Sequence, residues 1–290
     1  MGVAGIQFHK YHALGNDYLV IDPHTAALVL TPERVRALCD RHQGIGADGI
    51  VSGPTPDEQG ERDALRIRIF NPDGSEAEKS GNGIRIFARY ALEAGYVTAG
   101  VPFALRTVGG EVSVRILDER GALIEVDMGR PSFRSGDIPM LGRERDVVDE
   151  PLEIACEMLP LRVTCVSMGN PHCVIFTDEV TPEHAQRIGP LVENAACFPR
   201  RTNVQLARVR ARDRVEIAIW ERGAGYTLAS GSSSCAAAAA ARRLGLVDDE
   251  VVVQMPGGEL SVRFTAEGHA LLTGPVSGVA HGTLHHDLMS

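Results

Sequence analysis

The sequence predicts an α+β fold built by internal duplication, with two domains related by a pseudo-twofold axis. Residues 228–247 repeat the pattern of residues 78–97 at a shift of 150 residues (230 − 80), so that Ser80 matches Ser230. Three further blocks recur in the same order in the two halves, and chance explains one matching block but not four in register.

The further blocks indicate strands and turns on both sides of this repeat. The matched pairs are residues 14–22 with 168–176, residues 65–71 with 215–221, and residues 109–116 with 257–264. The middle pair alternates apolar and polar side chains, which is typical of half-buried strands. Each half therefore consists of a strand, a loop, a strand, a Gly-rich turn, a helix and a closing pair of strands.

The predicted helices give the domain architecture. They cover residues 84–94 and 235–244, and each ends at a glycine, Gly95 or Gly245. The second contains six consecutive alanines and no polar face before its end, which predicts burial on most sides. We expect each domain to be a mostly antiparallel sheet wrapped around its central helix.

The expected domains are residues 1–130, to which residues 277–290 return, and residues 131–276. The linker between them is expected in residues 128–137, which are rich in Gly, Pro and Ser.

The charge, the apolar runs and the motifs of the sequence argue against several classes of partner and cofactor. The 290 residues carry a formal net charge of −9, which argues against a nucleic-acid partner. The apolar run 235–241 is too short to span a membrane, and the first residues do not resemble a secretory signal. The six cysteines lack metal-ligand spacing, and no dinucleotide or P-loop motif is present. We therefore expect a cytoplasmic protein with no metal and no nicotinamide, flavin or pyridoxal cofactor.

The two Ser-Gly turns are the candidate active site. A helix that begins after Ser-Gly offers unpaired backbone N–H groups and the positive end of its dipole, which together bind an anion. Taken singly, Ser80 and Ser230 are best explained as helix N-caps. As a matched pair, we expect them to face each other across an interdomain cleft, on opposite faces of one carbon. Inversion of a stereocentre needs that arrangement, since one group removes a proton and the other returns one.

The blocks around these turns resemble diaminopimelate epimerase and the related cofactor-independent amino-acid racemases. The resemblance extends over residues 9–241 and rests on HALGNDYLVID, DRHQGIGADG, FNPDGSEAEKSGNGIRIFARY, SMGNPHCV, RRTNV and ERGAGYTLASGSSSCA. It implies an isomerase that acts on a small amino-acid substrate, without a cofactor, by two-base proton transfer at the α-carbon. The sequence leaves a homodimer open.

The resemblance also implies a role for each matching residue. The groups that bind the reacting carboxylate are the backbone N–H groups of Gly81, Asn82, Gly231 and Ser232. The groups that hold the rest of the substrate are Asn16, Asn71, Asn170, Asn203 and Arg222. His172 and Glu221 stand where the family contacts the substrate's α-amino nitrogen.

One departure from the family concerns the proton-transfer groups. The family has cysteines where this chain has Ser80 and Ser230. A thiol titrates near ~8.5, whereas a hydroxyl is closer to the ~15.7 of water, so forming an alkoxide costs about 10 kcal/mol more. A helix dipole contributes about 1–2 kcal/mol, so a serine needs an adjacent base, for which His172 and Glu221 are the candidates.

Three interpretations account for the serines. They can be introduced replacements of cysteine that trap a ligand, or they can serve a related dehydration or isomerisation in which one proton moves. Alternatively, the chain is an amino-acid-binding protein without turnover. In the first two cases we expect epimerase-type activity that is weak or altered.

Overall fold

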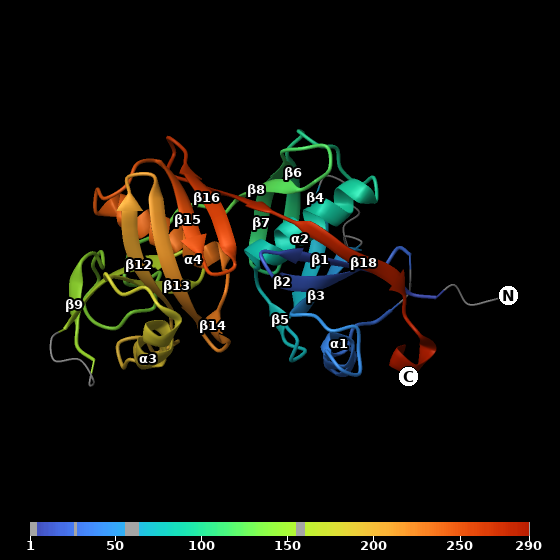
Figure 1. Ribbon diagram of the computed structural model, residues 1–290, viewed down its shortest axis with the longest axis horizontal. Helices are drawn as coiled ribbons and strands as arrows, with labels where there is room; N and C mark the ends of the chain where they lie inside the picture. Colours follow the sequence, from blue (N-terminus) through green and yellow to red (C-terminus); the bar gives the residue numbers. More distant parts are fainter. Residues whose placement is uncertain (1–4, 26–27, 56–63, 155–159, 290) are drawn as a thin grey trace. The chain divides into compact units, whose positions relative to one another are not determined.

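The computed structural model describes residues 5–25, 28–55, 64–154 and 160–289 (Figure 1). The chain forms two compact units, Met1–Val126 with Gly274–Ser290, and Asp127–Thr273. We call them the first and the second unit. The expected domain limits, at residues 130 and 276, lie a few residues beyond these boundaries.

The first unit pairs its strands in the order β18–β1–β2–β3–β4–β6–β7–β8. Its strands are β1 (Gln7–Ala13), β2 (Asn16–Ile21), β3 (Gly49–Thr55), β4 (Ala64–Phe70), β5 (Glu76–Ala77), β6 (Phe103–Thr107), β7 (Gly110–Ile116), β8 (Leu123–Asp127) and β18 (Ser277–Thr283). The pairs β2–β3 and β4–β6 are parallel, and the other pairs are antiparallel, including the short β5 on β4.

The second unit repeats this scheme in the order β9–β10–β11–β12–β13–β15–β16–β17. Its strands are β9 (Glu150–Leu152), β10 (Leu161–Ser167), β11 (Pro171–Phe176), β12 (Asn203–Ala211), β13 (Arg214–Glu221), β14 (Gly225–Thr227), β15 (Glu250–Met255), β16 (Gly258–Phe264) and β17 (Ala270–Pro275). The parallel pairs, β11–β12 and β13–β15, occupy the positions of the parallel pairs in the first unit. This agreement is consistent with a duplicated domain in a sheet-rich α+β fold, as the repeats predict.

Each unit has a long helix that starts at a Ser-Gly turn, α2 (Gly81–Glu93) and α4 (Gly231–Arg243). Helix α2 contacts β1, β2, β3 and β7, while α4 contacts β10, β11, β12, β13, β15 and β16. The alanines of α4 are buried, as their sequence predicts, because a side chain of one carbon lets strands approach the helix closely. In α2, Ile84, Ile86 and Phe87 are fully buried, and each contributes about 1.5–3 kcal/mol.

A shorter helix in each unit was not predicted: α1 (Pro32–Cys39) in the first and α3 (Pro182–Glu193) in the second. Both begin in the same way. Thr31 and Thr181 are their N-caps, each hydroxyl accepts a backbone N–H of the first turn, and proline follows at the first helical position. The chain ends in a short 3₁₀ helix, η1 (His286–Met289).

Candidate active site

The Ser-Gly turns present the N-termini of α2 and α4. Ser80 and Ser230 are extended N-cap residues, and their hydroxyl oxygens accept the backbone N–H groups of Gly83, at 3.1 Å, and Ser233, at 3.5 Å. The first N–H groups of a helix have no partner inside it, and the dipole makes this end positive. Each turn is therefore suited to bind an anion. The residues that begin the two helices are Gly81, Asn82, Gly231 and Ser232.

In the second unit, the serine contacts a carboxylate. Glu221 is the last residue of β13, and its carboxyl group lies beside the hydroxyl of Ser230. Burial raises the pKa of Glu221, and the neighbouring hydroxyl of Ser230 opposes the shift. Ser230 is itself buried, with 4% of its surface exposed. A carboxylate of raised pKa beside a hydroxyl is an arrangement in which the carboxylate can take the hydroxyl proton.

In the first unit, the serine has a different neighbour. Ser80 is half-buried, and its Oγ lies 3.5 Å from the phenolic oxygen of Tyr18. The residue at the position equivalent to Glu221 is Asn71, an amide whose Nδ2 donates to Oγ of Ser75 at 2.9 Å. The duplicated turns therefore differ in chemistry, because Ser230 contacts a carboxylate and Ser80 lies beside a phenol.

His172 lies in β11 and is fully buried. Its Nδ1 is 3.1 Å from Nε2 of Gln205, and its Nε2 is 2.9 Å from Oδ1 of Asn170. An amide nitrogen only donates, so Nδ1 accepts and the ring proton is on Nε2, from which it is donated to Asn170. Burial lowers the pKa of His172 to about 3, a shift that the hydrogen bond from Gln205 opposes and the charge of Arg222 reinforces. The imidazole is thus neutral, and both of its nitrogens have partners.

Asn203 connects the neighbouring elements. It is paired with His172 across the parallel strands β11 and β12, and its Nδ2 donates to the carbonyl of Pro171 at 2.8 Å. Its Oδ1 accepts the backbone N–H of Arg222 at 2.9 Å. Arg222 is exposed and donates through Nη1 to the carbonyl of Arg200 at 3.1 Å. Its guanidinium is therefore on the surface of the second unit, where it can reach a carboxylate.

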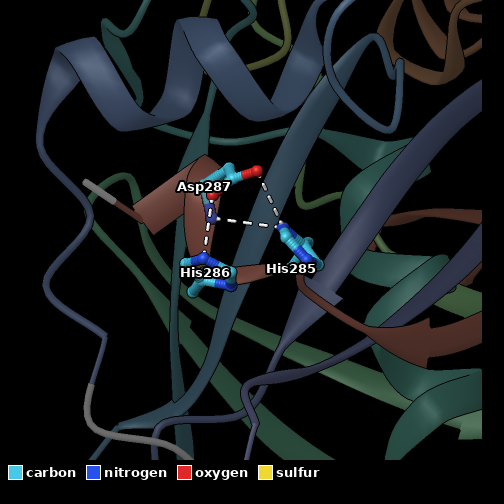
Figure 2. A group of neighbouring side chains, drawn as sticks. All are labelled: His285, His286 and Asp287. Atoms are coloured by element: carbon cyan, nitrogen blue, oxygen red, sulfur yellow. Dashed lines mark hydrogen bonds and ion pairs between the residues drawn. The ribbon is translucent and has the colours of Figure 1, made fainter.

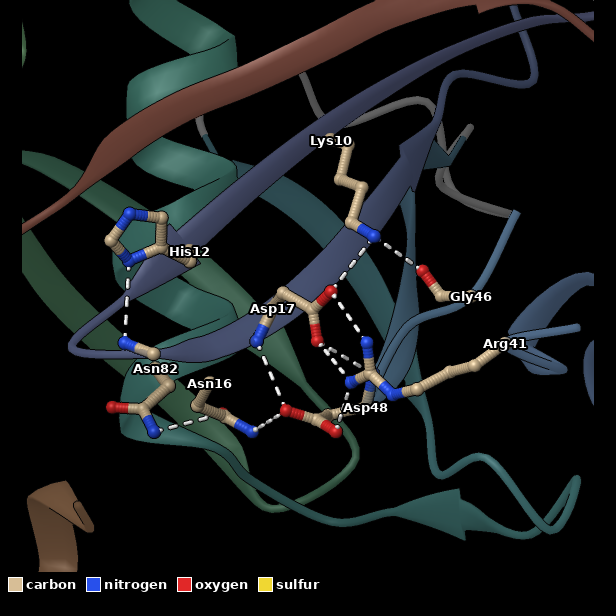
Figure 3. A network of polar contacts seen from close by, with 9 residues as sticks. Lys10, His12, Asn16, Asp17, Arg41, Gly46, Asp48 and Asn82 are labelled. Atoms are coloured by element: carbon tan, nitrogen blue, oxygen red, sulfur yellow. Dashed lines mark hydrogen bonds and ion pairs between the residues drawn. The ribbon is translucent and has the colours of Figure 1, made fainter. Parts of the chain in front are cut away.

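In the first unit, Asn16 and Asn82 contact each other (Figure 3). Nδ2 of Asn82 donates to Oδ1 of Asn16 at 2.9 Å, and Nδ2 of Asn16 donates to Oδ2 of Asp48 at 3.0 Å. Asn16 is the first residue of β2, and Asn82 is in the first turn of α2. The strand and the helix thus bring together two residues 66 apart in the sequence.

In each unit, some of the expected site residues are hydrogen-bonded to residues that the sequence patterns did not indicate. In the second unit Gln205 joins His172 to Ser233, to whose Oγ it donates at 3.0 Å. Gln205 is fully buried in β12. A polar residue between the apolar residues of this strand was the sequence signal that could have indicated it. In the first unit the unexpected residue is Asp48, although it lies inside one of the family-like blocks.

Among the described residues, one group of side chains could hold a metal ion (Figure 2). His285, His286 and Asp287 are exposed at the C-terminal end of the chain, and their ligand atoms lie within 4.8 Å of one another. Figure 2 shows both imidazoles turned towards the carboxylate of Asp287, at 3.2 Å and 3.0 Å. No sequence pattern indicated this cluster. Its residues belong to neither Ser-Gly turn.

Within the described ranges, no helix combines the length and the apolar character needed to cross a membrane.

Known proteins are similar to this chain in sequence and in fold. The sequence model of the diaminopimelate epimerase family matches residues 8–134 and 164–279 of this chain. The chain is 47% identical over 285 residues to diaminopimelate epimerase 2 of Nostoc sp., and the match covers 98% of each protein. It is 42% identical over 281 residues to diaminopimelate epimerase of Moorella thermoacetica, covering 96% of this chain and 98% of the relative.

A solved structure of a probable proline racemase from Agrobacterium radiobacter matches with a TM-score of 0.70 and 14% sequence identity. That match covers 97% of this chain and 93% of the racemase, and it concerns the fold alone. The family match extends over most of both units, and the relatives agree over nearly their full length. The chain therefore belongs to the diaminopimelate epimerase family.

Proposed function

We propose that the chain is a cofactor-independent amino-acid epimerase that acts at the α-carbon of diaminopimelate or a related amino acid. Family membership supports the reaction class. The position of Glu221 beside Ser230 is the observation that carries the chemistry, because it gives the serine the adjacent base that a hydroxyl needs. The proposal requires both Ser-Gly turns to reach the same carbon, from opposite faces.

The substrate carboxylate binds to the N–H groups at the two helix N-termini, supplied by Gly81 and Asn82 in one unit and by Gly231 and Ser232 in the other. Negative charge that develops when the α-proton leaves is stabilised by these N–H groups and by the helix dipoles. Asn16, Asn71, Asn170, Asn203 and Arg222 hold the remaining groups of the substrate.

Proton removal is assigned to Ser230. The bond between the α-carbon and its hydrogen breaks, Oγ of Ser230 takes that proton, and the original hydroxyl proton of Ser230 moves to Glu221. Ser80 donates its hydroxyl proton to the other face of the α-carbon and regains a proton from solvent. Glu221 releases its proton to solvent, which restores the starting state of both groups. His172 serves this site by orienting Asn170, since both of its ring nitrogens are engaged.

The serines make this reaction slow. The raised pKa of Glu221 strengthens it as a base, but a carboxylate remains far weaker than an alkoxide. Replacing the two serines by cysteines lowers the ~10 kcal/mol obstacle to forming the anion that acts as the base. We therefore expect the Ser80→Cys/Ser230→Cys protein to exchange the α-proton faster by several orders of magnitude than the present chain.

The experiment measures loss of the α-proton from LL-, meso- and DD-diaminopimelate in deuterated water by NMR, together with the change of stereoisomer. A matched control is Ser113→Cys/Ser261→Cys, which places two cysteines on β7 and β16 of the two units, away from the turns. It should behave like the unmodified chain. A double-cysteine protein at positions 80 and 230 that binds the substrate but exchanges no faster would refute the proposal.

The difference between the two serines supports a second candidate, an isomerase that moves a proton on one face only. Ser230 has the carboxylate of Glu221 as a neighbour, whereas Ser80 has the phenol of Tyr18. In that case the unmodified chain exchanges deuterium into the α-position with retention of configuration. Exchange with inversion supports the epimerase, and substrate binding without any exchange in either form supports a binding protein.

A further inference from the structure

A chain of hydrogen-bonded side chains crosses the first unit and ends at the N-terminus of α2 (Figure 3). Oδ2 of Asp48 accepts from Nδ2 of Asn16 at 3.0 Å, and Oδ1 of Asn16 accepts from Nδ2 of Asn82 at 2.9 Å. Oδ1 of Asn82 in turn accepts from Nη2 of Arg85 at 2.8 Å. Asn82 has 7% of its surface exposed, and Arg85 is fully buried.

The two ends of this relay determine the orientation of the amides between them. An ionised carboxylate only accepts hydrogen bonds, and a guanidinium only donates them. An amide does both, and it can rotate by half a turn at little intrinsic cost. With Asp48 at one end and Arg85 at the other, both Asn16 and Asn82 have one orientation in which every contact pairs a donor with an acceptor.

Asp48 is itself held in place by a compact group of charges (Figure 3). Its Oδ1 accepts from Nη2 of Arg41 at 2.7 Å, and Oδ2 also accepts the backbone N–H of Asp17 at 3.1 Å. Arg41 reaches Oδ1 of Asp17 at 2.7 Å, and Nζ of Lys10 lies 2.9 Å from Oδ2 of Asp17. Two carboxylates and two cations balance one another, so both oxygens of Asp48 face donors.

We propose that Asp48 is a positioning residue that sets the amide orientation of Asn16 and, through Asn16, that of Asn82. This inference rests on the proposed function, under which Asn16 holds part of the substrate and Asn82 contributes its backbone N–H beside it. Asp48 acts through the relay and is assigned no contact with substrate. Its effect is to present a defined donor and acceptor pattern to an amino-acid ligand beside the Ser80-Gly81 turn.

The substitution Asp48→Asn tests this with almost no change of shape. The new amide must direct its NH₂ group either at Arg41 or at Asn16, and both are donors in the native relay. If it faces Asn16, the amides of Asn16 and Asn82 must turn, and the NH₂ group of Asn82 then meets Arg85. Either outcome leaves donors facing donors in a partly buried site, which is unfavourable.

Two measurements are made on the full-length chain, the dissociation constant for meso-diaminopimelate by calorimetry and the side-chain amide signals of ¹⁵N-labelled asparagine by NMR. In Asp48→Asn we expect the amide signals of both Asn16 and Asn82 to shift, and the dissociation constant to rise by about tenfold or more. Glu111→Gln is the matched control, since it removes one carboxylate from an exposed pair with Arg106. It should leave the signals in place and the dissociation constant within about twofold.

Because the new NH₂ group can also face Arg41 and leave the relay intact, Asp48→Ala, which removes the acceptor of Asn16 altogether, is measured beside it. Unchanged Asn82 signals in both variants would overturn the relay whether or not the ligand binds. Shifted signals with an unchanged dissociation constant would overturn the positioning role. If the signals shift but the unmodified chain binds no amino acid, the proposed function fails while the relay stands. Should Asp48→Asn not fold, Asn16→Ala breaks the same relay without disturbing the contact between Asp48 and Arg41, and the Asn82 signals must again shift.

Discussion

The neutral, buried state of His172 makes folding stability depend on pH in a way that one substitution can isolate. In the unfolded chain an imidazole takes a proton with a pKa of 6.5, whereas burial in the folded protein lowers the pKa of His172 to about 3. Between these values the unfolded state binds one more proton than the folded state. Stability contributed by His172 is therefore fully present above the unfolded pKa and is lost as the pH falls towards the folded value.

The magnitude follows from the linkage relation. While only the unfolded state is protonated, the free energy of unfolding falls by about 1.4 kcal/mol per pH unit. At about pH 6 the histidine is not yet fully protonated in the unfolded chain, so the slope is below its maximum. Between about pH 6 and about pH 5, His172 therefore lowers the free energy of unfolding by about 1.2 kcal/mol. His172→Gln removes the titrating ring but retains an amide that can bond to Gln205 and Asn170.

Urea unfolding at a series of pH values measures this slope. We expect the unfolding free energy of the unmodified chain to fall more steeply below about pH 6 than that of His172→Gln, by about 1 kcal/mol over one unit. His42→Gln is the matched control, because His42 is exposed in the loop after α1 and its surroundings change little when the chain unfolds. Equal slopes in His172→Gln and the unmodified chain would refute the assignment of a buried, neutral imidazole.

Two further substitutions test the packing and the charges of the individual units. Gly189→Ala in α3 places a methyl group against Cβ, Cγ and Cδ2 of Trp220 and should lower the free energy of unfolding by about 1–3 kcal/mol. Gly136→Ala is the control, because its methyl group meets no atom within 4 Å and should change the free energy of unfolding little; urea unfolding of both variants measures the difference. Asp17→Asn should cost on the order of 2 kcal/mol at neutral pH, because hydrogen bonds from its cationic partners outweigh burial and lower the pKa of Asp17 from 3.8 to about 2. That stability is present above the unfolded pKa and is lost as the pH falls through about 2, so the variant and the unmodified chain should converge in acid.

Much of the fold could be predicted because the duplication makes each local sequence pattern occur twice in the chain. The Ser-Gly turns, the alanine helix and the alternating strands each appear twice, and the structure has them in matching positions of the two units. Helices α1 and α3 were missed although they carry such a signal. The tripeptide Thr-Pro-Glu occurs at Thr31 and again at Thr181, and it combines an N-cap, a proline at the first helical position and an acidic first turn.

The side-chain contacts of the site could not be predicted in the same way, because they depend on strand register and on residues far apart in the chain. Asp48 reaches Asn16 across 32 residues only because β2 and β3 run parallel from the same end. Gln205 meets His172 through the corresponding pairing of β11 and β12. A sequence pattern indicates that such residues are polar and near a strand end, but it does not specify which partner each of them contacts.

The backbone of the candidate site is duplicated, whereas its side chains are not. Both helix N-termini have the same capped geometry, and a carboxylate can use them equally because N–H groups carry no side-chain identity. The neighbours of the serines differ, with Glu221 at Ser230 and Tyr18 at Ser80, and so do the supports behind them. The first unit holds its asparagines between charged ends, and the second holds Asn170 with a neutral imidazole. The two faces of a stereocentre are not equivalent, since one loses a proton and the other gains one. Under the proposed function, these divergent side chains on a repeated backbone supply a different proton-transfer group to each face of the α-carbon.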